Sequence, residues 1–223
     1  MKYKAVIFDM DGLLLDTETI AIATFIAACQ EYAFDPDLNV FHKCIGVDWE
    51  TTKEIMSVEY GSSFPLKDVT DLWGKKMDQE MMQKPIPLKV GAFNLLQYLE
   101  KEDVKIALVT STRKEIARKE LSNAKIGNFF DFILGGNEVL RGKPNPEIYL
   151  TACQKLNEEP INCLALEDSD NGVLAAFHAG ITVIQIPDIV QPSAEVKALG
   201  HKVMRSLVEV ENMLKKSDQA FLK

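Results

Sequence analysis

The sequence predicts an α/β fold: a parallel sheet with helices on both faces and a helical segment inserted after the first strand. Three observations support this prediction. Residues 4–8 form a short apolar run that is typical of one buried strand. Residues 17–84 show helical periodicity without a strong strand signal. From residue 90 onward, short apolar strands alternate with helical stretches of about 10 to 15 residues, which indicates right-handed crossovers and a parallel sheet.

Composition and charge narrow the class of protein. The chain has 223 residues, of which 47% are hydrophobic, so it can build a sizeable core and is not expected to be disordered. The net charge of −8 argues against a nucleic-acid-binding surface. No apolar run approaches the roughly 18 residues of a membrane span, and the first residues do not resemble a signal peptide. The four cysteines lack C-x-x-C spacing. We therefore expect a cytoplasmic monomer with reduced thiols that acts on a small molecule, not on nucleic acid or a membrane.

The first strand and the helical segment divide the chain into two parts. Asp16 or Thr17 could cap the first helix, and Pro85 and Pro87 close the segment as a stiff connection. Within the segment, helices are expected at residues 17–34, 49–60 and 66–82. We predict a catalytic core of residues 1–16 and 85–223 and a helical cap of residues 17–84.

The remainder of the chain supplies the other strands. They are expected at residues 104–109, 129–134, 163–166 and 181–186. The intervening helices are expected at residues 91–101, 113–123, 146–156 and 172–179, with one or two covering helices over 193–214 and a fraying end at 217–223. Ligands of such sheets bind beyond the carboxyl ends of the strands. The polar residues at those ends are therefore the candidates for a site.

Polar residues follow four of the five predicted strands. They are Asp9 and Asp11, Thr110 and Ser111, Lys143, and Glu167 and Asp168. Taken alone, each has an ordinary explanation: Thr110 could be a strand-end or helix-cap hydroxyl, Lys143 a surface lysine, and the later acidic pair a complement to a helix dipole. The first acidic pair does not begin a calcium loop, because the further acids of such a loop are apolar residues here. Four separate explanations would have to coincide at one sheet edge, so a shared site is favoured.

The residue types at this edge suit phosphoryl transfer. Four carboxylates and one ammonium leave an excess of negative charge that a divalent cation could offset, and oxygen ligands suit Mg²⁺. A carboxylate can attack phosphorus and form an aspartyl-phosphate that water then hydrolyses. Groups at Thr110 and Ser111 could hold the phosphoryl oxygens. Lys143 could offset charge in the transition state, and Gly12 allows a sharp turn beside the ligand.

Four motifs in chain order can be compared with known families. They are Phe8-Asp9-Met10-Asp11-Gly12-Leu13, Leu108-Val109-Thr110-Ser111, Lys143-Pro144-Asn145-Pro146 and Leu166-Glu167-Asp168-Ser169-Asp170-Asn171-Gly172. These motifs resemble those of the haloacid dehalogenase superfamily, and most closely its phosphatases similar to β-phosphoglucomutase, in register from about residue 4 to about residue 187. The resemblance implies a Rossmann-like core with a small helical cap after the first strand. It also implies Mg²⁺-dependent hydrolysis of a small phosphorylated metabolite, such as a sugar phosphate.

The resemblance implies a role for each motif residue. Asp9 would be the nucleophile. Asp11 would be the general acid and base, which protonates the leaving oxygen and then deprotonates the attacking water. Thr110 would bind the phosphoryl group, and Lys143 would tie the phosphate to the nucleophile. The metal ligands would be Asp9, the carbonyl of Asp11, Asp168 and Glu167.

Two departures from the family pattern bear on the choice between a phosphatase and a mutase. The mutase carries a histidine where Ala21 stands and, near Trp49, an arginine that grips the second phosphate of its intermediate. Their loss favours a phosphatase with a neutral or weakly charged leaving group, and the mutase is kept as the alternative. Trp49 could stack on a sugar or base. The other candidate specificity residues are Thr17, Glu18 and Lys43.

Two further classes are disfavoured. A dehalogenase needs neither Mg²⁺ nor the second acid, Asp11. A non-hydrolytic phospho-acceptor module would also form an aspartyl-phosphate on a parallel sheet, but the helical segment, the chain length and a candidate base at Asp11 count against it.

Overall fold

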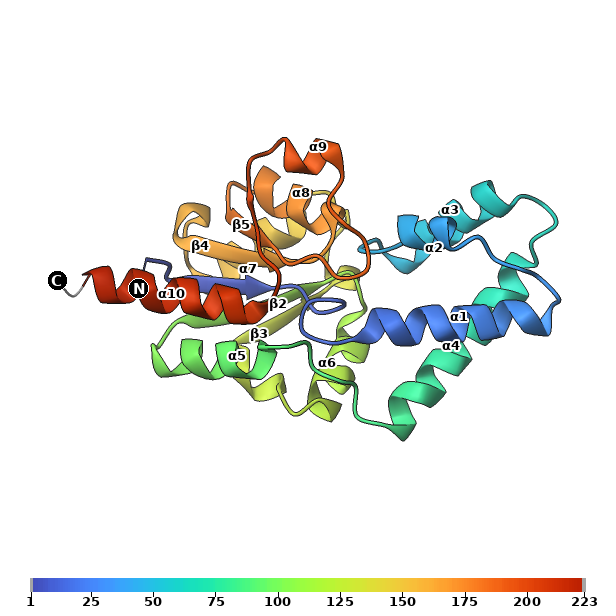
Figure 1. Ribbon diagram of the computed structural model, residues 1–223, viewed down its shortest axis with the longest axis horizontal. Coiled ribbons are helices and arrows are strands. Elements are labelled where there is room, and N and C mark those ends of the chain that lie inside the picture. The colour runs from blue at the N-terminus through green and yellow to red at the C-terminus, as the bar shows by residue number, and fades with distance from the viewer. Residues whose placement is uncertain (1, 222–223) are drawn as a thin grey trace.

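The computed structural model describes residues 2–221, apart from the side chains of residues 82, 83 and 218–221. The described residues form a six-stranded sheet in the order β3-β2-β1-β4-β5-β6, in which every neighbouring pair is parallel (Figure 1). The strands are β1 Ala5–Phe8, β2 Lys105–Thr110, β3 Phe132–Gly135, β4 Cys163–Glu167, β5 Thr182–Gln185 and β6 Lys202–Val203. This arrangement confirms the predicted α/β class.

Apolar clusters lie on both faces of the sheet, because successive side chains of a strand point to opposite sides. Val6 and Phe8 of the central strand β1 pack into one cluster, and Ala5 and Ile7 pack into the other. The first cluster receives helices α5 Ala92–Lys101, α6 Lys114–Asn123 and α10 Leu207–Phe221. The second receives α7 Glu147–Leu156, α8 Asp170–His178 and α9 Ala194–Lys197. Burial on both faces explains why β1 is apolar along its whole length and β4 is apolar up to Glu167.

The helical segment between β1 and α5 lies to one side of the sheet (Figure 1). Its helices are α1 Thr17–Glu31, α2 Leu38–Lys43, α3 Trp49–Tyr60 and α4 Leu66–Gln83. They share a separate apolar cluster that includes Phe25, Met56 and Trp73. The two connections to the sheet lie against each other, since the amide of Asp16 donates to the carbonyl of Pro87 over 2.9 Å. The segment therefore has a core of its own and a narrow attachment.

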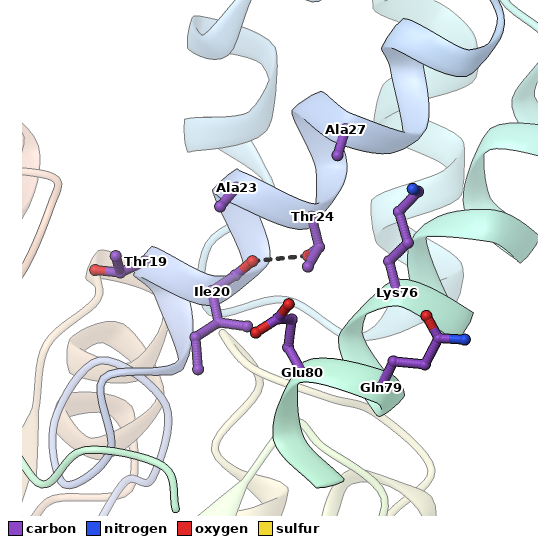
Figure 2. Close-up of a pocket in the computed structure, with 8 residues that line it drawn as sticks. All are labelled: Thr19, Ile20, Ala23, Thr24, Ala27, Lys76, Gln79 and Glu80. Carbon is purple, nitrogen blue, oxygen red and sulfur yellow. Dashed lines mark hydrogen bonds between the residues drawn. The ribbon is translucent and has the colours of Figure 1, made fainter. Parts of the chain in front are cut away.

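A groove of about 380 Å³ runs between α1 and α4 (Figure 2). Small residues of α1, such as Ala23 and Ala27, face the longer side chains of Lys76, Gln79 and Glu80 on α4. None of the polar residues that follow the sheet strands lines this groove. The groove is therefore separate from the candidate site.

The region after β5 corrects one prediction. One or two helices were expected over residues 193–214, but the short strand β6 separates α9 from α10. Its two exposed residues, Lys202 and Val203, are too few to form a recognisable strand pattern, and their pairing with Ile184 and Gln185 of β5 defines the strand. Helix α10 continues to Phe221 through most of the segment expected to fray, and residues 222 and 223 lie outside the described part.

Smaller differences concern the ends of elements. The first helix ends at Glu31, three residues before the expected end. The strand β3 begins at Phe132 and not at residue 129, since residues 127–129 form a 3-10 turn. Asp16 occupies the N-cap of α1, but its carboxylate accepts the hydroxyl of Thr19 and no backbone amide. Two other 3-10 turns span Gly136–Glu138 and Pro160–Asn162. No helix in the described chain is both long enough and apolar enough to span a membrane.

Candidate active site

Three predicted metal ligands meet at the carboxyl edge of the sheet. Asp9 follows β1, while Glu167 ends β4 and Asp168 follows it, and all three are at least nine-tenths buried. One carboxylate oxygen from each lies within 4.8 Å of the others. The parallel register explains this proximity, because Phe8 pairs with Leu166 and thereby places the residues after both strands side by side.

Lys143 lies inside the acidic cluster. It comes from the loop between β3 and α7, and its side chain is 1% exposed. Its Nζ donates to Asp9 Oδ1 at 2.5 Å and to Glu167 Oε1 at 2.6 Å. Burial alone would lower the pKa of Lys143, but the two carboxylates outweigh it and raise that pKa above the ordinary value. Lys143 therefore carries a positive charge against Asp9 and Glu167.

The single ammonium does not offset all the carboxylates. Burial raises the pKa of Asp9 well above its ordinary value, and Glu167 and Asp11 add to the effect despite the attraction of Lys143. Burial, Asp9 and Glu167 likewise raise the pKa of Asp168. Both shifts mean that the charged forms are under-stabilised by the protein alone. A bound cation would supply the missing positive charge.

Glu167 is held from one side only. Its Oε1 accepts from Lys143 and from the hydroxyl of Tyr149, the latter over 2.5 Å. Its Oε2 is buried and has no hydrogen-bond partner among the described residues. The carboxylate lies against Gly172 of α8, where an added Cβ would come within 2.0 Å of Oε2. Tyr149 was not predicted from the sequence, because a tyrosine on the apolar face of a helix is typical of a core position.

The Asp11 carboxylate lies beside this cluster and accepts hydrogen bonds from three threonine hydroxyls. Thr17 donates to its Oδ1 over 2.8 Å. Thr110 and Thr112 donate to its Oδ2 over 3.2 and 2.9 Å. These bonds fix the direction of the Asp11 carboxylate. Thr112 was missed in the sequence, where its spacing of two from Thr110 was the available signal, since alternate residues of an extended chain face the same side.

Thr110 and Ser111 make contacts that differ in kind. The Thr110 hydroxyl is fully buried and also accepts the backbone amide of Thr112 over 3.0 Å. The Ser111 hydroxyl donates to the carbonyl of Gly46 in the helical segment over 3.1 Å. The Gly46 backbone lies close to Ser169 as well, since an added Cβ would be 2.4 Å from Ser169 Oγ. The loop before α3 therefore covers the edge of the sheet that carries the acids.

Gly12 is required by both its conformation and its surroundings. Its φ of +75° lies in the left-handed region, which L side chains rarely adopt. An added Cβ would be 2.5 Å from Asp168 Oδ2. The turn after β1 thus brings backbone directly against a predicted metal ligand.

Glu18 extends the acidic surroundings onto the first turn of α1. Burial, together with the charges of Asp11 and Asp188, raises the pKa of Glu18 to about 8. Asp188 is itself paired with Lys89 over 2.6 Å. Glu18 therefore keeps its proton to higher pH than an ordinary glutamate, and in the protonated form it can donate as well as accept a hydrogen bond.

The two remaining specificity candidates lie on the helical segment. Lys43 forms an exposed ion pair with Glu59 over 2.8 Å. The Trp49 side chain is 44% exposed, and its ring packs on Trp73 with centroids 5.0 Å apart. In the described structure, neither residue makes a hydrogen bond or ion pair with the strand-end residues. Their roles in specificity stay predictions.

Comparison with known proteins places these motifs in a family. The model of the haloacid dehalogenase-like hydrolases matches residues 6–186. A phosphorylated carbohydrates phosphatase of Thermotoga maritima is 30% identical over 214 residues, covering 95% of this chain and 96% of the relative. A β-phosphoglucomutase of Bacillus subtilis is 31% identical over 191 residues, covering 82% and 83%.

The fold agrees with this assignment. A crystal structure of a hydrolase from Pseudomonas syringae superposes with a TM-score of 0.80 at 24% identity, covering 96% of this chain and 98% of that one. At this identity the likeness concerns the fold alone. With the family model matching from β1 to the end of β5, the chain belongs to the haloacid dehalogenase-like hydrolases, as its four motifs predict.

Proposed function

We propose that the protein is a Mg²⁺-dependent phosphatase that hydrolyses the phosphate ester of a small, neutral metabolite, such as a sugar phosphate, through an aspartyl-phosphate. The observation that carries this proposal is the buried Asp9, Glu167 and Asp168 cluster, bound on one side by Lys143. Asp11 stands beside this cluster with its carboxylate directed by three hydroxyls. A nucleophile, a cation site and an acid–base group are thus within one site.

The residues present suit a hard divalent cation. Glu167 Oε2 is a buried oxygen without a described partner. The raised pKa values of Asp9 and Asp168 indicate that a nearby positive charge would stabilise their ionised forms. All the donors are oxygens, which Mg²⁺ prefers. Asp9, Asp168, Glu167 and the carbonyl of Asp11 would hold it. When bound, Mg²⁺ would neutralise charge on the phosphoryl oxygens.

The chain's own residues account for both chemical steps. A carboxylate oxygen of Asp9 forms a bond to phosphorus while the bond from phosphorus to the ester oxygen breaks. Asp11 donates its proton to that departing oxygen. In the second step Asp11 removes a proton from water, the water oxygen bonds to phosphorus, and the bond to Asp9 breaks. Lys143 holds the other Asp9 oxygen and keeps the nucleophile from turning away.

The surroundings of the site favour a neutral leaving group. The Glu18 carboxyl, whose pKa is raised by burial and by nearby acids, can bind a hydroxyl in either protonation state, and it would repel a second anionic group when ionised. Lys43 is already paired with Glu59, and Ala21 lies in the apolar cluster of the helical segment. A relative is named as a phosphatase of phosphorylated carbohydrates, which suits this substrate class.

A mutase is the second candidate, because a relative of similar identity is named as a β-phosphoglucomutase. A mutase must rebind a bisphosphorylated intermediate, which calls for a second cationic site. By the family resemblance, Ala21 stands where the mutases carry a histidine, and Trp49 lies near the position of their arginine. These positions favour hydrolysis.

The test is phosphate release from sugar phosphates, polyol phosphates, nucleotides and phosphoglycolate, with Mg²⁺ and with EDTA. We expect release from neutral sugar or polyol esters, loss of activity in EDTA, and none from Asp9→Ala. An Asp9→Ala protein as active as the parent would refute the mechanism. Conversion of a sugar 1-phosphate into the 6-phosphate without free phosphate would identify the mutase. A phosphoenzyme that persists for many minutes without turnover would identify a phospho-acceptor module.

We also propose that the protein acts in the cytoplasm as a monomer. All four cysteines are buried free thiols, which suits a reducing compartment. Fractionation of cells and size-exclusion chromatography test these two statements, and an extracellular or dimeric protein would contradict them.

A further inference from the structure

Tyr149 lies on α7 directly beneath the acidic cluster and is fully buried. Its hydroxyl donates to Glu167 Oε1 over 2.5 Å. The Nζ of Lys143 lies 5.6 Å from the centroid of its ring. One side chain thus contacts both partners of the buried Lys143–Glu167 ion pair.

The hydroxyl of Tyr149 is the part that requires explanation. A buried hydroxyl is costly unless it is hydrogen-bonded, and phenylalanine would fill nearly the same space without that need. The neighbours of Tyr149 on the same helix face, Ala152 and Cys153, are buried core residues. The hydrogen bond to Glu167 is therefore the feature that distinguishes this position from ordinary packing.

The contacts of Glu167 fix the orientation of its carboxylate. Two donors, Lys143 and Tyr149, converge on Oε1, and Gly172 lies against the carboxylate from the side of α8. Turning the carboxylate away from this orientation would break both bonds. Oε2 is left without a described partner, and the Glu167 carboxylate has an oxygen within 4.8 Å of carboxylate oxygens of Asp9 and Asp168.

We propose that Tyr149 is a positioning residue, which holds Glu167 by Oε1 so that Oε2 is presented to the divalent cation. This inference rests on the proposed Mg²⁺-dependent function. Removing a group that hydrogen-bonds to a metal ligand and orients it typically weakens metal binding by about 10- to 100-fold. The tyrosine would act through Glu167 and would not contact the substrate.

The test is calorimetric titration of Mg²⁺ into the metal-free protein without substrate. We expect Tyr149→Phe to bind Mg²⁺ about 10- to 100-fold more weakly than the parent. Tyr60→Phe is the matched control, because it also removes a hydroxyl, one that donates to the carbonyl of Asp37 over 2.8 Å in the helical segment. Its Mg²⁺ affinity should equal that of the parent. At saturating Mg²⁺, Tyr149→Phe should recover kcat with an unchanged KM for the substrate.

A double-mutant cycle shows whether the effect passes through Glu167. In a Glu167→Ala background, Tyr149→Phe should weaken Mg²⁺ binding no further. An equal loss in that background, or an unchanged affinity in Tyr149→Phe alone, would overturn the inference. A parent protein that binds no Mg²⁺ would instead overturn the proposed function itself, so the two failures are distinguishable.

A spectroscopic measurement covers the case in which Tyr149→Phe does not fold. Mg²⁺ bound at Oε2 withdraws electron density from Oε1 and should perturb the ultraviolet absorption of the tyrosine bonded to it. We expect a Mg²⁺-induced tyrosine difference spectrum in the parent and in Tyr60→Phe, and none in Glu167→Ala. Absence of that spectrum in a parent that binds Mg²⁺ would overturn the inference.

Discussion

Replacing Lys143 with methionine tests how much the buried ion pairs contribute to the fold. The methionine keeps most of the side-chain volume but removes a charge that is 1% exposed and bonded to two carboxylates at 2.5 and 2.6 Å. Asp9 and Glu167 would then be left buried without their cation. Removing one partner of a buried ion pair typically costs about 3 to 5 kcal/mol. For a chain of this length, that corresponds to a fall in Tm of roughly 6 to 20 °C.

The loss should depend on pH. The pKa of Asp9 is already raised above its ordinary value of 3.8, and removing Lys143 takes away the charge that opposes this shift. A carboxyl with a raised pKa in the folded state stabilises the fold fully below its unfolded pKa, and this contribution is lost as the pH rises through the folded pKa. The destabilisation of Lys143→Met should therefore be smallest below about pH 3.8 and grow toward neutral pH.

The assay is urea or thermal unfolding of metal-free protein across this pH range. Lys67→Met is the matched control, because Lys67 pairs with Asp71 on the exposed surface of α4 and its removal should leave the unfolding free energy unchanged. Added Mg²⁺ should restore part of the stability of Lys143→Met by supplying positive charge to the same carboxylates. A loss no greater than that of the control, or a loss that is independent of pH, would refute the reasoning.

Three further predictions follow from the site. Gly12→Ala and Gly61→Ala should each lose about 1 to 3 kcal/mol of unfolding free energy, because both glycines have a φ above +70° that L side chains rarely adopt. Only Gly12→Ala should also lose Mg²⁺ affinity and activity, since its Cβ meets Asp168 whereas that of Gly61 meets nothing within 4 Å. Equal activity in both variants would contradict this. Thr112→Val removes a hydroxyl that donates to Asp11 over 2.9 Å, and steady-state kinetics should show kcat lowered about 10- to 100-fold. An unchanged kcat would exclude a role for Thr112 in directing Asp11. The raised pKa of Glu18 destabilises the parent as the pH rises from about 4.5 through about 8, so unfolding of Glu18→Gln should show a shallower pH dependence there. Identical slopes would contradict that pKa.

Sequence patterns predicted the strands of the central sheet because their physical causes are local. A strand buried on both faces must be apolar along its whole length, and β1 and β4 carry that signal until they end in acids. The two-residue strand β6 carries no such signal. It exists because Lys202 and Val203 pair with an edge of β5 that only the folded sheet presents.

The position of the motifs at the ends of parallel strands similarly predicted which residues would gather. Asp9 and Asp168 are far apart in sequence, but the parallel pairing of β1 with β4 brings the carboxyl ends of those strands together. The candidate cluster of Asp9, Lys143, Glu167 and Asp168 could thus be predicted before the structure. Likewise, the sequence predicted a tight turn at Gly12, and the φ of this residue is positive.

The sequence by itself therefore determined the fold class, the family and the acids at the sheet edge, since these follow from periodicity and from strand ends. Only the tertiary structure decided which partner each site residue has: Tyr149 donates to Glu167, Thr112 donates to Asp11, and Ser111 donates to the carbonyl of Gly46. The reason is physical. Periodicity reports which face of an element is buried, whereas a hydrogen bond depends on two side chains from different elements meeting at a distance that no single segment encodes.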